Sequence, residues 1–153
     1  MNPLQRGQLG VLLTQSLLVA LVVGLAASIA DMVLRENVGL PAGAVLLPVL
    51  LLLVYPTLIG PLRRFAAWGY AMDEDELHLA HGLWTHVHTV VPLARIQHID
   101  VSQGPVERLW GVSRLVVHTA GTLHSRVALP GLARADAEAM RDRIRGRIRQ
   151  EPA

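Results

Sequence analysis

The sequence contains neither cysteine nor lysine, and its first 62 residues are almost free of charge. Without cysteine, the chain has no disulfide, no thiol nucleophile and no thiolate ligand for a metal. All 14 basic residues are arginine, and the formal net charge is only +2. Nucleic-acid binding requires a concentrated basic surface with interleaved aromatic residues, and outside the predicted C-terminal helix no such stripe exists. We therefore expect no nucleic-acid partner.

Two long apolar segments occupy the first half of the chain. Residues 9–30 carry no charge, and as a helix they would span roughly 33 Å, enough for a bilayer core of about 30 Å. The second segment covers residues 41–62. Pro41 suits a first helical turn, whereas Pro48 and Pro56 are expected to kink or interrupt the helix. We predict a transmembrane hairpin over residues 1–64 and a soluble domain over residues 65–153.

The first apolar segment has small side chains at every fourth position, which places them on one stripe of a helix: Ser16, Ala20, Gly24 and Ser28. Small residues let two membrane helices approach closely, and the second span is the expected partner. Neither span contains a charged residue, which argues against a proton or ion pathway.

The arginines predict an orientation in the cytoplasmic (inner) membrane. Arg6 precedes the first span, and Arg63 and Arg64 follow the second, whereas the connecting loop at residues 31–39 has one arginine and two acids. The positive-inside rule places both termini and the soluble domain in the cytoplasm, with the loop outside. A cleaved signal peptide is the competing interpretation of the first span. Its apolar run is longer than a signal peptide needs, and a second span follows.

The soluble half shows the alternating pattern of antiparallel strands. We predict six strands near residues 68–72, 77–79, 86–92, 96–101, 115–119 and 125–129. Residues 73–76 and Gly121 are expected to form turns, residues 103–105 to break the fourth strand, and Pro130–Gly131 to end the strand series. The predicted fold class is α+β, with a small antiparallel sheet or barrel that one C-terminal helix covers.

The C-terminal helix is predicted over residues 133–149. One apolar stripe repeats at three and four residues and consists of Ala133, Ala137, Met140, Ile144 and Ile148. Acidic residues come early and arginines late, which the helix dipole favours. We interpret the arginines at positions 141, 143, 145, 147 and 149 as a solvated helix end. The alternative is contact with anionic lipid headgroups.

A composite motif runs through the soluble half, and we call it the family motif. Its members are Pro92, Arg95, Ile96, Gln97, Gln103, Gly104, Arg108, Gly111, Thr119, Ala120 and Gly121. It resembles the signature of the bacterial pleckstrin-homology (PH) domain membrane proteins of the YdbS-like family, over residues 68–148. That family also carries two membrane helices before the domain. The resemblance implies a PH-like antiparallel barrel capped by a C-terminal helix, and it implies no catalytic residue and no cofactor.

Two roles are open for the polar members of the family motif. Its glycines meet backbone needs at turns and bends. Arg95, Gln97 and Arg108 either hydrogen-bond the long connection between the fourth and fifth strands or form an exposed binding patch. We favour the structural role. Phosphoinositide-binding PH domains use a basic loop between their first two strands, but the acidic residues 73–76 stand there and would repel a phosphate.

The histidines are the other candidate cluster. If Leu83 and Trp84 form a tight hairpin loop, His81 faces His86, with His88 on the same face, and three imidazoles would suit zinc. We favour the alternative of an exposed polar strand face and predict no metal site. Ser102, Ser113 and Ser125 lie in no nucleophile motif, and His98 with Asp100 is an ordinary pair on a strand. We therefore predict no enzyme.

Two functional hypotheses follow from these residues. The first is a membrane-anchored adaptor whose partner is a neighbouring membrane protein or another copy of the chain. The second is binding of a lipid or envelope ligand at the membrane surface, in a groove flanked by Arg63, Arg64 and the helix arginines. A metal-dependent activity at the histidines is a third and weaker hypothesis.

Overall fold

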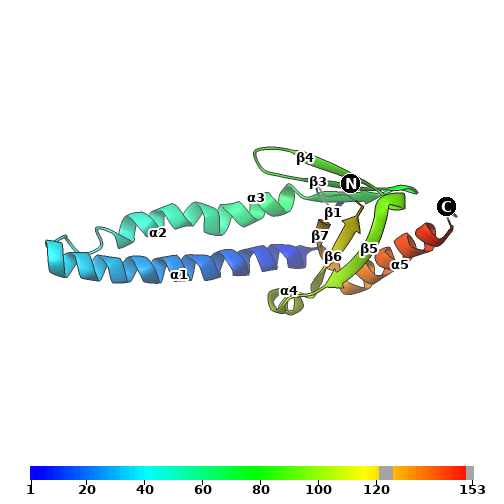
Figure 1. Ribbon diagram of the computed structural model, residues 1–153. Helices are drawn as coiled ribbons and strands as arrows, with labels where there is room; N and C mark the ends of the chain where they lie inside the picture. The colour runs from blue at the N-terminus through cyan, green and yellow to red at the C-terminus, as the bar shows by residue number, and fades with distance from the viewer. Residues whose placement is uncertain (121–125, 151–153) are drawn as a thin grey trace. The chain divides into compact units, whose positions relative to one another are not determined.

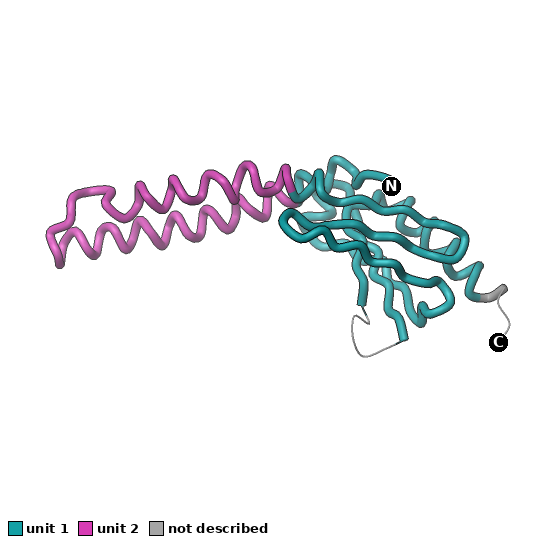
Figure 2. The backbone as a smooth tube through the Cα atoms, turned by 90° about the horizontal axis from the view of Figure 1, so that it is seen from above, with its two compact units in different colours: residues 1–11, 64–153 teal, residues 12–63 magenta. Residues whose placement is uncertain are grey.

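The structure is a computed structural model that describes residues 1–120 and 126–150. The chain divides into two compact units (Figure 2). Residues 64–153 and the N-terminal segment Met1–Val11 form the first unit, the domain unit, and Leu12–Arg63 form the second, the hairpin unit. The sequence had placed all of residues 1–64 in the hairpin. The boundary differs because the first eleven residues pack on the domain.

The hairpin unit is built from the two apolar segments (Figure 1). Helix α1 covers Arg6–Val38, and the second segment consists of α2 (Leu46–Val54), a π-helical turn (Tyr55–Ile59) and α3 (Gly60–Ala66). Both segments are long and apolar enough to cross a membrane. In the most apolar stretch of each, only 6% and 17% of the residues are buried, whereas the core helix of a soluble protein is mostly buried.

The connection between the helices lies later in the chain than expected. Helix α1 does not end at residue 30, because residues 31–38 contain neither glycine nor proline, and it ends just before Gly39, whose φ is +74°. The second helix begins at Leu46 rather than Pro41. Asp31 accepts hydrogen bonds from the backbone N–H groups of Gly43 and Val45, both at 2.9 Å. A side chain of α1 thereby satisfies N–H groups at the start of the second helix.

The small-residue stripe meets the second helix over part of its length. Ser16 Oγ donates to the carbonyl of Thr57 at 3.1 Å, and Gly24 faces the Leu50 side chain, whereas Ser28 is exposed. The prediction for Pro56 is confirmed, because the helix widens into its π-helical turn there. The prediction for Pro48 was wrong. Pro48 lies in the first turn of α2, where its missing N–H leaves no intrahelical bond unmade.

The domain unit contains two antiparallel sheets. The first has the order β1-β2-β3-β4 and consists of Asn2–Pro3, Gly69–Met72, Glu76–His81 and Val87–Pro92. The second has the order β5-β6-β7 and consists of Ile96–Ser102, Val112–Thr119 and Arg126–Ala133. A 3-10 turn at Leu93–Arg95 joins the sheets, α4 (Pro105–Leu109) joins β5 to β6, and α5 (Arg134–Gln150) follows β7.

The core lies between the two sheets and α5. Alternate strand residues point inward, and Leu77, Leu79, Leu115 and Leu129 are almost fully buried. The predicted stripe of α5 is confirmed by the burial of Ala137 and Ile144 and the packing of Met140 and Ile148. Leu4, from the N-terminal segment, joins the same core, which the sequence did not indicate. The strands and the helix together make the α+β, PH-like fold.

The prediction that Pro130–Gly131 ends the strand series was wrong, because β7 continues to Ala133. Ser113 pairs with Leu132 and Leu115 with Leu129, so Pro130 and Gly131 together oppose one residue of β6. A bulge of this kind tolerates a proline, since no ladder hydrogen bond is required there. Gly131 has φ +72°, and a Cβ on it would lie 2.7 Å from Gln8 Cβ.

We predict that Gly131→Ala lowers the free energy of unfolding by about 1–3 kcal/mol, because alanine is strained at positive φ and would collide with Gln8. Gly146→Ala is the matched control. Gly146 lies in α5 with open space around its Cβ position, and alanine there is expected to add up to about 1 kcal/mol of helix stability. Thermal unfolding of the two full-length variants in detergent, followed by circular dichroism, measures the difference. Equal melting temperatures would contradict it.

Candidate functional site

The edge strands are β1 and β4 in the first sheet and β5 and β7 in the second sheet. An edge strand presents unpaired backbone groups on which another chain can add a strand. Natural proteins protect such edges with short strands, prolines, bulges, charges or covering segments. The protection of each edge therefore indicates where a partner can bind.

Three of the edges carry such protection. Strand β1 is short and contains Pro3. Strand β5 has a shift in register between Ile96 and His98 and carries the charged Asp100. Strand β7 has the bulge, and its Gly131 carbonyl accepts a hydrogen bond from the backbone N–H of Gln5 at 2.9 Å. Pairing with an added strand is disfavoured at all three.

Strand β4 lacks these features apart from Pro92 at its end. It pairs with β3 in unbroken register, from Glu76 opposite Pro92 to His81 opposite Val87. It contains no carboxylate and no arginine, and Val87 and Val90 are 40% and 41% exposed. We call Trp84, Val87, His88 and Val90 the β4 edge surface. Within residues 1–120 and 126–150, β3 is the only strand that pairs with β4.

The register also shows which backbone groups of β4 are directed outward. Leu93 N–H donates to the carbonyl of Asp75 at 2.8 Å, one step beyond the end of the β3–β4 ladder. Because hydrogen-bonded pairs alternate in an antiparallel ladder, the backbone groups of His88 and Val90 point away from β3. The backbone of Pro92, two residues further along, also points away from β3, but proline has no N–H. The free edge therefore offers donors and acceptors at two successive outward positions.

Trp84 stands at the tip of the hairpin and is 87% exposed. The loop occupies residues 82–86, not the two residues that the sequence suggested. Gly82 has φ +120°, and a side chain on it would collide with the Thr85 carbonyl, so the chain makes a wider turn that only glycine allows. The wide turn leaves an aromatic ring in solvent beside the start of β4.

The same loop separates the histidines that were considered for zinc. His81 pairs with Val87 instead of His86, and its ring stacks on Trp68 with centroids 4.6 Å apart. His88 lies on the other face, 5.5 Å from the ring of His78. The predicted common face of His81, His86 and His88 was therefore wrong, because the register differs by one residue. The described residues contain no group of three potential ligands placed around a metal position.

The acidic turn before β3 is exposed, as expected. His78 Nε2 lies 3.3 Å from carboxylate oxygens of both Asp73 and Glu76. Asp73 and Glu74 also line a hollow of about 270 Å³ together with Met72 and two arginines of α5, Arg143 and Arg147. Two of the helix arginines thus face carboxylates of the same domain, which balances their charge. Burial, with help from the nearby carboxylate of Asp136, raises the pKa of the Tyr70 phenol.

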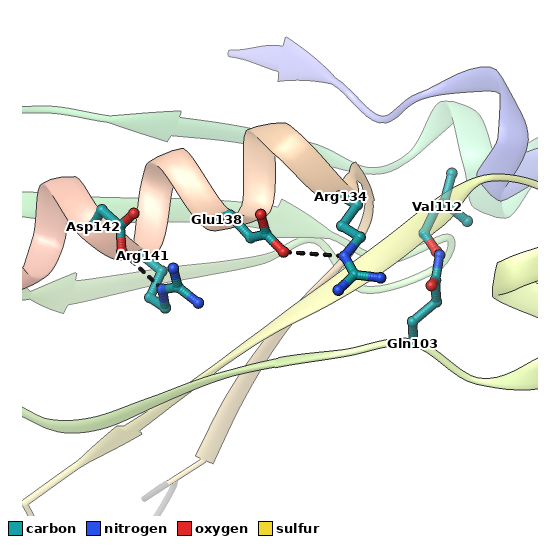
Figure 3. Close-up of polar contacts among 6 residues, drawn as sticks. All are labelled: Gln103, Val112, Arg134, Glu138, Arg141 and Asp142. Atoms are coloured by element: carbon teal, nitrogen blue, oxygen red, sulfur yellow. Dashed lines mark hydrogen bonds and ion pairs between the residues drawn. The ribbon is translucent and has the colours of Figure 1, made fainter.

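Part of the family motif holds the connection between β5 and β6 in place. Gln103 Nε2 donates to the carbonyl of Val112 at 2.9 Å (Figure 3). Gly104 N–H donates to Glu107 Oε2 at 2.7 Å, and Arg114 donates to Glu107 Oε1 at 2.9 Å. Glu107 is only 7% exposed, and sequence reasoning missed it. One signal in the sequence pointed to this role: Glu107 lies three residues after Gly104, where a helix begins, which is the spacing of a capping box.

Other motif residues take different positions. Ile96 is buried and pairs with Thr119, and the Arg95 carbonyl accepts a hydrogen bond from Ala120 N–H at 3.0 Å. The side chains of Arg95, Gln97 and Arg108 are exposed and make no hydrogen bond or ion pair to the described residues. Gly111 has φ +66°, which agrees with the backbone role proposed for it. Gly121 and Ser125 lie outside the described residues.

The candidate catalytic residues do not form a site in the described part of the chain. Ser113 is fully buried in β6. Asp100 lies 3.0 Å from His98 Nε2 and 3.5 Å from His118 Nε2, and all three side chains are partly exposed on the outer face of the sheet. A carboxylate beside two imidazoles on an exposed strand face is an ordinary polar contact of a protein surface.

The architecture is that of a PH-like domain attached to a hairpin of two apolar helices. The family model described as "Bacterial PH domain" matches residues 9–148, and the chain belongs to that family. It is 33% identical over 84 residues to the protein described as "UPF0699 transmembrane protein YdbS" from Bacillus subtilis (strain 168). The match covers 55% of this chain and 51% of that protein, so the chain spans about half the length of this relative. No solved structure matches the chain significantly. The protein is accordingly a transmembrane protein with a bacterial PH domain.

We predict that Glu107→Ala lowers the free energy of unfolding by about 2–3 kcal/mol, because it removes two charge-assisted hydrogen bonds and leaves their donors without an acceptor. Glu138→Ala is the control. Glu138 accepts a hydrogen bond from Arg134 at 3.0 Å on the exposed face of α5 (Figure 3), and its loss is expected to cost about 0.5 kcal/mol. Thermal unfolding compares the two variants, and equal losses would contradict the prediction.

Proposed function

We propose that this protein is a non-enzymatic adaptor or assembly module. The transmembrane hairpin holds the PH-like domain at the inner face of the cytoplasmic membrane, and the β4 edge surface binds an extended segment of a partner. The observation that carries this proposal is the contrast between β4 and the three protected edges. The partner is another membrane protein or a second copy of this chain.

Strand addition explains how the β4 edge surface would recognise its partner. The outward backbone groups of His88 and Val90 supply main-chain hydrogen bonds, which give affinity with little sequence preference. Val87, Val90 and Trp84 add apolar contacts that select the side chains of the partner. Because both proteins are confined to one membrane, the effective concentration is high and a modest affinity suffices.

The alternative function, binding of a lipid or envelope ligand between the basic residues, has less support. Arg143 and Arg147 share their hollow with Asp73 and Glu74, so the net charge there does not favour an anion. Arg63 donates to the hydroxyl of Tyr55 at 3.1 Å within the hairpin unit. Replacement of Arg64 and the helix arginines by glutamine is therefore expected to leave partner binding unchanged.

The orientation that we propose is testable because the chain has no cysteine of its own. We expect Glu36→Cys, near the end of α1, to react with a membrane-impermeant maleimide added to intact spheroplasts. Thr85→Cys, in the exposed loop of the β3–β4 hairpin, is expected to react only after the membrane is permeabilised. The reverse pattern of labelling would place the domain outside the cell.

The adaptor proposal predicts that Val90→Pro abolishes co-purification of the partner with tagged, full-length protein from native membranes in mild detergent. Proline at position 90 removes an N–H that points away from β3, so no hydrogen bond to β3 is lost. Pro92, two residues further along, shows that β4 accommodates a proline at a position whose backbone points outward. Val90→Thr keeps the N–H and is expected to keep the partner. If the partner is a second copy, Val90→Pro halves the mass measured by light scattering.

An unchanged partner in the Val90→Pro protein, with an unchanged melting temperature, would contradict the proposal. A specifically enriched lipid with no protein in stoichiometric amount would favour the alternative function.

A further inference from the structure

The connection between β5 and β6 exposes two adjacent large apolar side chains at the end of α4. Leu109 is 81% exposed and Trp110 is 48% exposed. Gln103 and Glu107 hold this connection through hydrogen bonds to Val112, Gly104 and Arg114. Leu109 is thus almost entirely exposed to solvent, and about half of the Trp110 surface is, although exposing apolar surface to water is unfavourable. They lie in the connection between two strands of the second sheet, whereas β4 belongs to the first sheet.

Trp110 also packs on the first turns of α1, which belong to the same domain unit. A side chain on Gly10 would collide with the indole ring, and one on Gly7 would collide with the Trp110 carbonyl. Gly10 is itself buried, so the ring covers the helix at this point. The two glycines thus allow the ring of Trp110 to lie directly against the backbone of α1.

The contact falls where α1 changes from a polar to an apolar segment. Arg6 is exposed at the first residue of the helix, and the uncharged run of residues 9–30 begins immediately before Gly10. In a transmembrane protein, the start of such a run lies close to the boundary between water and the hydrocarbon core. Trp110 therefore lies against the part of α1 where the uncharged run begins.

We propose that Leu109 and Trp110 form a lipid-binding contact of the domain itself, inserted into the headgroup and upper acyl region of the bilayer. Tryptophan prefers this interface because its ring is apolar and its indole N–H is polar. Leucine next to it gains from burial among acyl chains. Arg108 directly precedes Leu109 in sequence, and Arg6 is the first residue of α1. Both side chains are exposed and would meet anionic headgroups.

Single-tryptophan proteins test this contact without altering it. The chain has three tryptophans. The double variant Trp68→Phe with Trp84→Phe keeps only Trp110, and Trp68→Phe with Trp110→Phe keeps only Trp84 as the matched control. Each full-length protein is reconstituted into phosphatidylcholine and phosphatidylglycerol vesicles whose acyl chains are brominated either near the headgroup or near the terminal methyl.

We expect Trp110 to emit at shorter wavelength than Trp84 and to lose most of its emission in the lipids brominated near the headgroup. Trp84 is expected to keep its emission in both lipids and to be quenched by aqueous acrylamide. Quenching of Trp110 by acrylamide to the same extent as Trp84 would overturn the proposal. Protection of Trp110 from both acrylamide and brominated lipid would also overturn it, since a protein surface would then cover the ring.

Leu109 is tested separately by a spin label on Leu109→Cys, with Trp84→Cys as a control of similar exposure. We expect oxygen to relax the label at position 109 more than a water-soluble nickel chelate does, with the opposite ranking at position 84. The nickel chelate dominating at both positions would overturn the proposal. These results are independent of the Val90 variants, so failure of the lipid contact and failure of the adaptor function are distinguishable.

Discussion

The packing of the N-terminal segment on the β7 bulge is the constraint on which the rest of the domain depends. Gly131 has no side chain and a positive φ, so Leu4 and Gln8 can lie against it, and its carbonyl receives the backbone N–H of Gln5. This contact brings Leu4 into the core and Asn2–Pro3 alongside β2. It also closes part of the β7 edge, and within the domain unit Gly7 and Gly10 of the first turns of α1 lie against Trp110.

The two proposed surfaces follow from how the fold treats exposed groups. Three sheet edges carry a proline, a bulge, a charge or a covering backbone contact, and β4 alone presents exposed valines in continuous register. The exposed pair Leu109–Trp110 lies in the connection that the hydrogen bonds of Gln103 and Glu107 hold in place. Burial of exposed apolar surface is favourable. In the two proposals, a partner strand covers the β4 edge surface and lipid covers Leu109–Trp110.

Sequence periodicity predicted the elements better than their pairing. The strands between residues 69 and 129 and the stripe of α5 were expected, because alternation and 3.6-residue spacing are local properties. The register of the β3–β4 hairpin was not predictable, since it depends on the loop at residues 82–86, whose close backbone approach and positive φ require Gly82. The register differs by one residue from the expected one, so His81 lies opposite Val87. The three histidines considered for zinc therefore do not share a face. The continuation of β7 through Pro130 was missed because a bulge accommodates proline without losing a bond.

Two apolar spans before a small α+β domain could be predicted from the amino-acid pattern alone, because hydropathy and residue periodicity depend only on neighbours along the chain. The family motif likewise indicated the family that the domain match then established. The N-terminal residues that join the domain, the unprotected sheet edge and the exposed tryptophans became known only from the folded chain. Burial and edge protection depend on contacts between residues far apart in sequence, such as Gln5 with Gly131 and Gly10 with Trp110.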